Sequence, residues 1–241
     1  MAALLALQNV SKAFGSLRVV DELTLAVGEG EALGVIGPNG AGKTTALNLM
    51  IGRLRPERGA VVFAGRDITS APPYARCRAG IALTHQIPHP FDALTVFENV
   101  LVGGVFGGGT SERLARGPSM DALALAGLAA KANTRAGALT LLERKRLELA
   151  RALATGPRVL LLDEIAGGLS EHEVHELVEV IRRVHGAGVA IIWIEHIVHA
   201  LRAVVSRLAV ISAGRMLTDG APDAVMASAE VQRVYLGIDV Q

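Results

Sequence analysis

The distribution of apolar and polar residues predicts alternating strands and helices. Apolar and polar residues alternate over residues 4–27 between turn-forming residues, which predicts antiparallel strands. Helical spacing over residues 44–51 and 174–185 predicts two helices. Short, wholly apolar runs indicate buried strands at residues 32–36, 159–162 and 189–194. Apolar strands separated by helices are typical of a parallel central sheet.

The remaining pattern predicts two hairpins and a helical insertion. Residues 61–63 precede the turn Ala64-Gly65, and residues 208–211 and 215–217 flank a turn at 212–214. From residue 87 to about 138 the spacing is mainly helical, interrupted by Gly103-Gly104 and by a flexible glycine turn at 107–109. We therefore expect a single domain over residues 1–241. Its core comprises residues 1–86, with the antiparallel part, and 154–241; residues 87–153 form an inserted helical subdomain.

Residues 139–153, LTLLERKRLELARAL, begin with a helix-start signal. Thr140 followed three residues later by Glu143 predicts a capping box, and leucine and alanine then recur at helical spacing. Leu141 and Leu142 occupy the first turn, where a helix that meets a phosphate is better served by bare backbone.

Composition narrows the class of protein. The 241 residues are 51% hydrophobic and 20% charged, with a net charge of +1, so no basic field favours nucleic acid as a partner. We interpret Arg144-Lys145-Arg146 and Arg182-Arg183 as solvated helix faces. The one cysteine, Cys77, excludes an intramolecular disulfide and suits a reducing compartment.

The mean hydropathy of +0.40 raises the question of a membrane span. No stretch approaches the ~20 apolar residues that a spanning helix needs. Residues 1–7 are apolar but lack a charged leader, and they read as a first strand. The excess apolar surface is expected to face a partner.

The strongest motif is GVIGPNGAGKTT, residues 34–45. It fits the phosphate-loop pattern and lies between an apolar strand and a helix, which disfavours a chance glycine turn. Backbone N–H groups from Gly40 to Thr44 are expected to surround phosphate oxygens. Lys43 would supply a charge to the β- and γ-phosphates, and the Thr44 hydroxyl would bind Mg²⁺. The motif predicts binding of a nucleoside triphosphate.

A second motif, VLLLDE at residues 159–164, places two carboxylates at the end of a buried strand. Ligands of open α/β sheets bind at this end. Asp163 is suited to hold Mg²⁺ through its water shell, and Glu164 is suited to accept a proton from attacking water.

The order of these motifs, with Gln86 after an apolar strand and His196 after another, resembles the ATP-binding cassette ATPases over the whole chain. The resemblance implies an α/β P-loop NTPase with a mainly parallel central sheet, an N-terminal antiparallel β-subdomain and an inserted helical subdomain. It implies hydrolysis of ATP with Mg²⁺. It also implies that Gln86 contacts Mg²⁺ and water and faces the membrane partner, and that His196 contacts the γ-phosphate. The nucleotide contacts so implied are Phe14, which stacks on adenine, Gly37, Asn39, Gly40, Ala41, Gly42, Lys43, Thr44, Thr45 and Thr140.

Plainer interpretations of single residues remain open. If Phe14 does not stack on adenine, it would cover the sheet. His196 and His199 suggest a metal pair, but the sequence offers no evident third ligand. His172 and His175 are expected to be exposed. The roles of His85 and His89, which flank Gln86, are open.

Within the family, residues 83–100, 163–201 and 231–237 resemble the ATPase subunits of branched-chain amino-acid importers. The implied partners are a second ATPase subunit, two membrane permeases and, indirectly, an extracytoplasmic solute-binding protein, at the cytoplasmic face of the inner or plasma membrane. The alternatives are an exporter or lipid-extraction ATPase and a largely regulatory ATP-binding subunit.

The first turn at Thr140 aligns with the family's signature, Leu-Ser-Gly-Gly-Gln, which caps the γ-phosphate bound by the partner ATPase. Here Leu141 and Leu142 replace the glycines, and Glu143 adds a negative charge. At about 6 Å and an effective dielectric near 20, that charge would repel a unit phosphate charge by roughly 3 kcal/mol. Ser170, where the D-loop at 168–170 usually has an aspartate, weakens the dimer contact. These departures favour a heterodimer with one impaired site.

Overall fold

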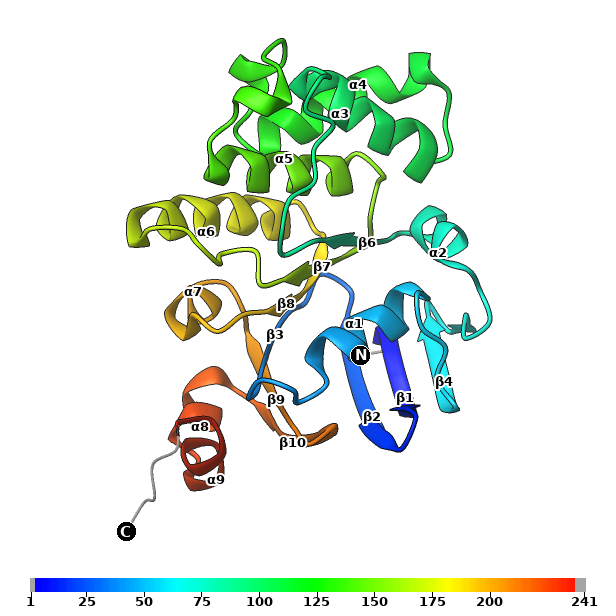
Figure 1. The fold of residues 1–241 in the computed structure, drawn as a ribbon, viewed down its shortest axis with the longest axis vertical. Helices are drawn as coiled ribbons and strands as arrows, with labels where there is room; N and C mark the ends of the chain where they lie inside the picture. Colours follow the sequence, from blue (N-terminus) through cyan, green and yellow to red (C-terminus); the bar gives the residue numbers. More distant parts are fainter. Residues whose placement is uncertain (1–2, 237–241) are drawn as a thin grey trace. The chain divides into compact units, whose positions relative to one another are not determined.

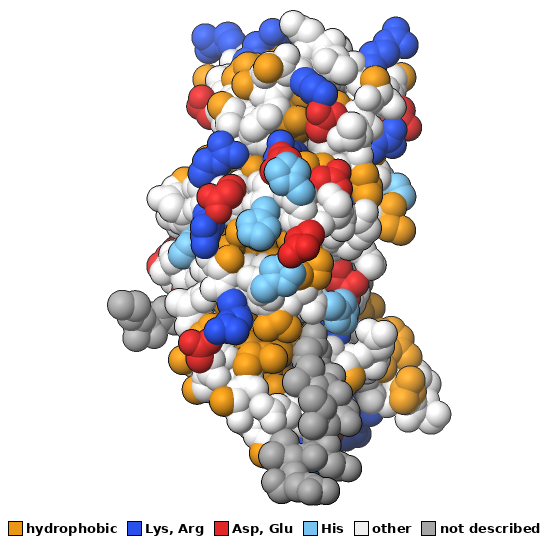
Figure 2. All heavy atoms as spheres, turned by 90° about the vertical axis from the view of Figure 1, so that its left-hand side faces the viewer, with side chains coloured by type: hydrophobic (Ala, Val, Ile, Leu, Met, Phe, Trp, Pro, Cys, Tyr) orange, Lys and Arg blue, Asp and Glu red, His pale blue; other side chains and the backbone are white. Residues whose placement is uncertain are grey.

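The computed structural model describes residues 3–236, which excludes the first two residues of the expected first strand and Gly237 of the importer-like tail. The chain forms two compact units (Figure 1), Met1–Pro73 with Ala190–Gln241, and Tyr74–Val189. On the face shown in Figure 2, Lys and Arg side chains lie among Asp and Glu side chains, consistent with the near-neutral net charge.

The first unit contains the antiparallel sheet that residue alternation predicts. Its spatial order is β2-β1-β4-β5, and Leu7 of β1 pairs with Leu25 of β2 and Val61 of β4. All three of these side chains are buried, which fixes the strand register by burying one face. The strands are β1 (Ala3–Phe14), β2 (Leu17–Gly28), β4 (Arg58–Phe63) and β5 (Arg66–Asp67).

The same unit contains a parallel group of strands. β3 pairs in parallel with both β8 and β9, and β10 returns antiparallel to β9. Gly34 of β3 lies opposite Trp193 of β8, a side chain with no exposed surface. Every residue of β3 and β8 is buried, as expected for apolar runs covered on both faces. The strands are β3 (Ala32–Ile36), β8 (Ala190–Ile194), β9 (Arg207–Ser212) and β10 (Arg215–Gly220).

Helices complete the first unit. α1 is the helix expected after the phosphate loop, whereas the sequence interpretation missed the others, which span a few residues each. They are α1 (Lys43–Ile51), α7 (Val198–Arg202), α8 (Pro222–Ala227), α9 (Ala229–Val231) and the π-helix η4 (Gln232–Leu236).

The second unit contains two parallel strands, β6 (Ile81–Thr84) and β7 (Val159–Asp163), with Thr84 opposite Leu162. Because the strands run in the same direction, the residues that follow each of them emerge at one edge. The helices of this unit are α2 (Pro73–Ala79), which begins at the last residue of the first unit, α3 (Val96–Val102), α4 (Glu112–Leu125), α5 (Leu141–Leu153) and α6 (Glu171–Gly186), with the π-helix η1 (Gly103–Gly107) and the 3₁₀-helices η2 (Ala129–Lys131) and η3 (Ala136–Ala138).

Gly103 and Gly104 do not interrupt the helical region, contrary to the sequence interpretation. They continue α3 as η1, and a Cβ at Gly103 would lie 2.5 Å from the Arg151 carbonyl oxygen. At Gly104 a Cβ would lie 3.1 Å from that of Ala115. These glycines permit close helix packing, whereas the chain turns at Gly109, where φ is +69°. The buried core here includes Val96, Leu123 and Leu147.

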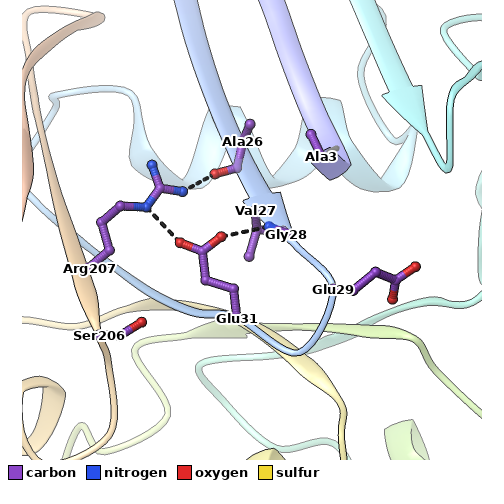
Figure 3. Close-up of a pocket in the computed structure, with 8 residues that line it drawn as sticks. All are labelled: Ala3, Ala26, Val27, Gly28, Glu29, Glu31, Ser206 and Arg207. Atoms are coloured by element: carbon purple, nitrogen blue, oxygen red, sulfur yellow. Dashed lines mark hydrogen bonds and ion pairs between the residues drawn. The ribbon is translucent and has the colours of Figure 1, made fainter. Parts of the chain in front are cut away.

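Arg207 joins four parts of the first unit at a cleft of about 450 Å³ (Figure 3). Its Nε and Nη1 contact Glu31 Oε1 and Asp219 Oδ2, each at 2.6 Å. Nη2 donates to the Ala26 carbonyl oxygen, and Glu31 Oε2 accepts from the Gly28 N–H at 2.6 Å. This guanidinium therefore ties β9 to β2, to the β2–β3 turn and to β10.

We expect Arg207→Met to lower the free energy of unfolding by about 1–3 kcal/mol, because it leaves the half-buried Glu31 and the exposed Asp219 without their cation. Urea unfolding measures the change. The matched control is Arg202→Met, since Arg202 pairs with Asp223 at an exposed position and its loss should cost less than about 1 kcal/mol. Equal losses in the two variants would contradict the structural role of Arg207.

Candidate nucleotide-binding site

The phosphate loop follows β3 directly and leads into α1. Gly42 is the N-cap residue, with φ +98°, and no side chain caps the helix. The Ala41 N–H donates to the Pro38 carbonyl oxygen at 3.2 Å, which closes a turn inside the loop. A helix N-terminus with no side-chain cap and no acidic residue in its first turn favours an anionic ligand.

Two glycines of this loop lie against neighbouring backbone. A Cβ at Gly37 would be 2.0 Å from the Ile211 carbonyl oxygen of β9, and a Cβ at Gly42 would be 2.6 Å from the Val19 carbonyl oxygen of β2. No L side chain fits at either place without a shift of backbone. The motif glycines are therefore required by the packing of the first unit, as well as by any ligand.

Lys43 lies over its own loop. It is 6% exposed, and its Nζ donates to the carbonyl oxygens of Gly37 at 2.7 Å and Pro38 at 3.0 Å. Thr44, in the first turn of α1, is exposed, and Thr45 is half-buried. A buried cation beside a turn of bare backbone, followed by an exposed hydroxyl, fits a polyphosphate with its Mg²⁺.

Other expected contacts in the first unit lie at strand ends. Phe14 ends β1 with 48% exposure, and Lys12 Nζ lies 5.7 Å from its ring centroid. His196 follows the end of β8 and is exposed, whereas the preceding Glu195 is 2% exposed. The described residues contain no cluster of three or more His, Cys, Asp or Glu side chains suited to a metal ion.

The second unit brings Gln86 and Glu164 together. Gln86 follows β6 and Glu164 follows β7, at the edge where both parallel strands end. Gln86 Nε2 donates to Glu164 Oε2 at 2.8 Å. Asp163, the last residue of β7, is half-buried.

Glu164 has a left-handed backbone with φ +47°. Such a conformation is unusual for a non-glycine residue and costs about 1–3 kcal/mol. Residues held in this way concentrate at functional sites, where the strain fixes the direction of a side chain.

The helix start at residues 139–143 confirms one expectation. Thr140 is the N-cap of α5, and the capping box is complete: Glu143 Oε2 accepts from the Thr140 N–H at 3.0 Å, and Thr140 Oγ1 accepts from the Glu143 N–H at 3.4 Å.

The charge and the side chains at this helix start differ from the sequence expectation in two ways. Glu143 Oε1 pairs with Lys131, so the negative charge is largely neutralised within the unit. Burial raises the pKa of Glu143, but the hydrogen bonds from Lys131 and Thr140 outweigh it and lower the pKa. Leu142 is 6% exposed and packs inward, whereas Leu141 is 42% exposed. One leucine, rather than two, therefore lies over the helix start.

The interpretation of Arg144-Lys145-Arg146 as a solvated face is wrong for Lys145, which is 2% exposed. Arg146 pairs with Glu176 of α6 at 2.6 Å. Arg182 and Arg183 are exposed, as expected. His172 and His175 are exposed, as expected, and Cys77 is half-buried in α2.

The sequence does not predict two side-chain contacts of residues near the candidate site. Lys131, the partner of Glu143, lies twelve residues upstream, and no local pattern marks it. His85 Nδ1 lies 2.9 Å from Glu148 Oε1 of α5. The glutamate-rich helical pattern gave no signal that this carboxylate turns inward.

Comparison with known proteins identifies the class. Residues 20–167 match the ABC transporter family, and the chain belongs to it. It is 35% identical over 242 residues to the lipopolysaccharide export system ATP-binding protein LptB of Acidithiobacillus ferridurans, covering 100% of both chains. It is 31% identical over 237 residues to LptB of Escherichia coli K12, covering 98% of both.

Solved structures of ATP-binding cassettes have the same fold as this chain. The ADP conformation of an ATP-binding cassette of an ABC transporter superposes with a TM-score of 0.90, 26% identity and coverage of 99% of this chain and 100% of that chain. A nucleotide-free cassette gives a TM-score of 0.89 at 27% identity, covering 98% and 100%.

These findings confirm the expected fold class, the ATPase activity and the use of ATP with Mg²⁺. As an ABC ATPase the chain works with membrane permeases, dimerises, and acts at the cytoplasmic face of the membrane as a peripheral subunit. The relatives do not support the importer sub-family, because those whose names give a transport system belong to lipopolysaccharide export. Within residues 3–236, every helix is too short or too polar to cross a bilayer.

We expect Gly42→Ala to weaken ATP binding about ten-fold or more, because a Cβ meets the Val19 carbonyl oxygen and φ is +98°. Binding of a fluorescent ATP analogue measures the loss. Gly30→Ala is the control, since Gly30 also has a positive φ of +60° but nothing lies within 4 Å of its Cβ position. Unchanged affinity in Gly42→Ala would contradict the assigned loop.

Proposed function

We propose that this chain is the ATP-hydrolysing subunit of a transporter that exports an amphiphilic lipid or extracts it from the membrane. The support is the identity of 35% and 31% to lipopolysaccharide export ATPases over nearly the whole chain. Energising uptake of branched-chain amino acids is the second candidate. It is supported by the resemblance of residues 83–100 and 163–201 to importer ATPases.

The observation that carries the hydrolytic role is the hydrogen bond of 2.8 Å between Gln86 and Glu164. We assign Glu164 as the general base, because its strained backbone aims the carboxylate toward the Gln86 amide. Gln86 would orient the attacking water, and His196 would contact the γ-phosphate.

The binding roles follow the same assignment. Lys43 and the backbone N–H groups from Gly40 to Thr44 would hold the phosphates. Thr44, Gln86 and Asp163 would hold Mg²⁺, which stabilises the charge that develops on the phosphates. Phe14, exposed at the end of β1, would stack on adenine.

We further propose that residues 87–153 act as a helical subdomain around the buried cluster of Val96, Leu123 and Leu147. The segment from Gln86 to Val100, which joins β6 to α3, would pass closure of the ATPase dimer to two membrane permeases. A solute-binding protein would take part only in the importer alternative.

The dimer partner is proposed to be a different ATPase subunit. Leu141 lies 42% exposed at the helix start, where its side chain keeps the backbone from a ligand held by the partner. Ser170 is occupied as the N-cap of α6, in a capping box with Glu173. With Glu143 paired to Lys131, the exposed leucine becomes the main ground for an impaired site.

Purification of the native complex tests the transported substrate. We expect two permeases to co-purify, and ATP hydrolysis to rise when an amphiphilic lipid is added, because substrate contacts lie on the permeases. The same assay with leucine and a co-purified solute-binding protein, in place of the lipid, serves as the comparison. Stimulation by leucine and its binding protein, with no response to lipid, would replace export by import.

The impaired-site proposal predicts slow ATP hydrolysis by the chain alone and faster hydrolysis when the partner ATPase is added. Glu164→Gln should trap ATP in the mixed dimer, since the general base is lost while the carboxamide keeps its shape. Leu141→Gly should speed the lone chain by exposing the helix start. Wild-type turnover in Glu164→Gln, or fast hydrolysis by the lone chain, would refute the corresponding assignment.

A further inference from the structure

One face of α5 carries charged side chains that are buried. Lys145 and Glu148 are buried, at 2% and 7% exposed, and Arg151, three residues later, is half-buried. Residues three apart lie on one side of a helix. A buried charge needs a partner, and an apolar residue would fill the same volume without that requirement. The burial of these charges therefore indicates that they hold neighbouring groups in a defined position.

Their contacts lie in residues 85–89, the segment that follows β6. Lys145 Nζ donates to the Gln86 carbonyl oxygen at 3.1 Å. Glu148 Oε1 lies 2.9 Å from His85 Nδ1. Two successive residues of the segment are thus held by two side chains of one helix.

Arg151 extends this contact by three residues. Its Nη1 donates to the His89 carbonyl oxygen at 2.7 Å and contacts Glu148 Oε2 at 3.2 Å. The Phe91 ring lies beside the guanidinium, with 5.3 Å from Cζ to the ring centroid. Through Nη1 and the face of its guanidinium, Arg151 therefore connects the main chain at His89, the Glu148 carboxylate and the Phe91 ring.

The held segment carries the contact to the proposed general base. Gln86 is fixed through its carbonyl oxygen by Lys145, while its side chain donates to Glu164 Oε2 at 2.8 Å. A side chain that must orient a reacting group within a fraction of an ångström depends on the neighbouring residues that hold it in place.

We propose that Lys145, Glu148 and Arg151 are positioning residues for ATP hydrolysis. They hold residues 85–89 on α5 so that the Gln86 amide stays directed at Glu164. The inference rests on the proposed function, because it takes Glu164 as the general base. α5 is one continuous helix from Leu141 to Leu153, so its start at Thr140 and these three side chains belong to one rigid element.

Lys145→Met in the assembled transporter complex tests the proposal. We expect kcat for Mg-ATP to fall about ten-fold or more while KM changes by less than about two-fold, because the phosphate loop is untouched. Lys145→Arg keeps a cationic donor and should recover most of the rate. Unchanged kcat in Lys145→Met would overturn the proposal.

Glu148→Gln provides a milder variant of similar shape if Lys145→Met does not fold. Its kcat should fall in the same sense, with KM again nearly constant. The matched control is Arg146→Met, which removes a neighbouring cation of α5 that pairs with Glu176 instead. Equal kcat losses in Arg146→Met and in the positioning variants would reduce their role to helix stability and overturn the proposal.

A double-mutant cycle with Gln86→Ala gives the second readout. If Lys145 acts through Gln86, then Lys145→Met should cause no further loss in the Gln86→Ala background. Losses that multiply would overturn the inference. Glu164→Gln assayed in parallel separates the two proposals. Wild-type turnover in Glu164→Gln would contradict Glu164 as the general base. Loss of turnover in Glu164→Gln together with normal turnover in Lys145→Met would contradict only the positioning role.

Discussion

Carbonyl oxygens of two strands lie so close to the phosphate loop that Gly37 and Gly42 have no room for a side chain. The Ile211 and Val19 oxygens set this limit from β9 and β2, two different sheets of the first unit. The loop must therefore expose bare backbone, and α1 must begin without a side-chain cap. Lys43 then closes over the loop as its buried cation. The bare backbone that the loop presents is in this sense a result of how the sheets pack.

Local sequence was sufficient where a single short-range rule decides the structure. The apolar run at Ala32–Ile36 is a strand with those bounds, and the capping box at Thr140 forms as its spacing predicts. The sequence predicts Glu164 from its place at the end of a buried strand and Gln86 from the family resemblance, and parallel pairing of β6 and β7 brings the two residues together. Motif residues fixed by backbone geometry are thus the predictable part of the site.

Sequence reasoning failed where tertiary contacts override a local pattern. A run of three cations on a helix predicts a solvated face, but Lys145 points inward, where its Nζ donates to the Gln86 carbonyl oxygen. Gly103 is expected to break a helix, yet it begins η1, and the nearby Arg151 carbonyl oxygen leaves no room for a side chain there.

The buried Trp193 has a practical consequence for studying the two units. It is the single tryptophan of the chain, it has no exposed surface, and it lies in β8 of the first unit. Its emission should shift to the red when water reaches that interior. Far-ultraviolet circular dichroism, in contrast, follows the long helices of the second unit. Together the two optical signals distinguish stepwise melting of the units from a single cooperative transition.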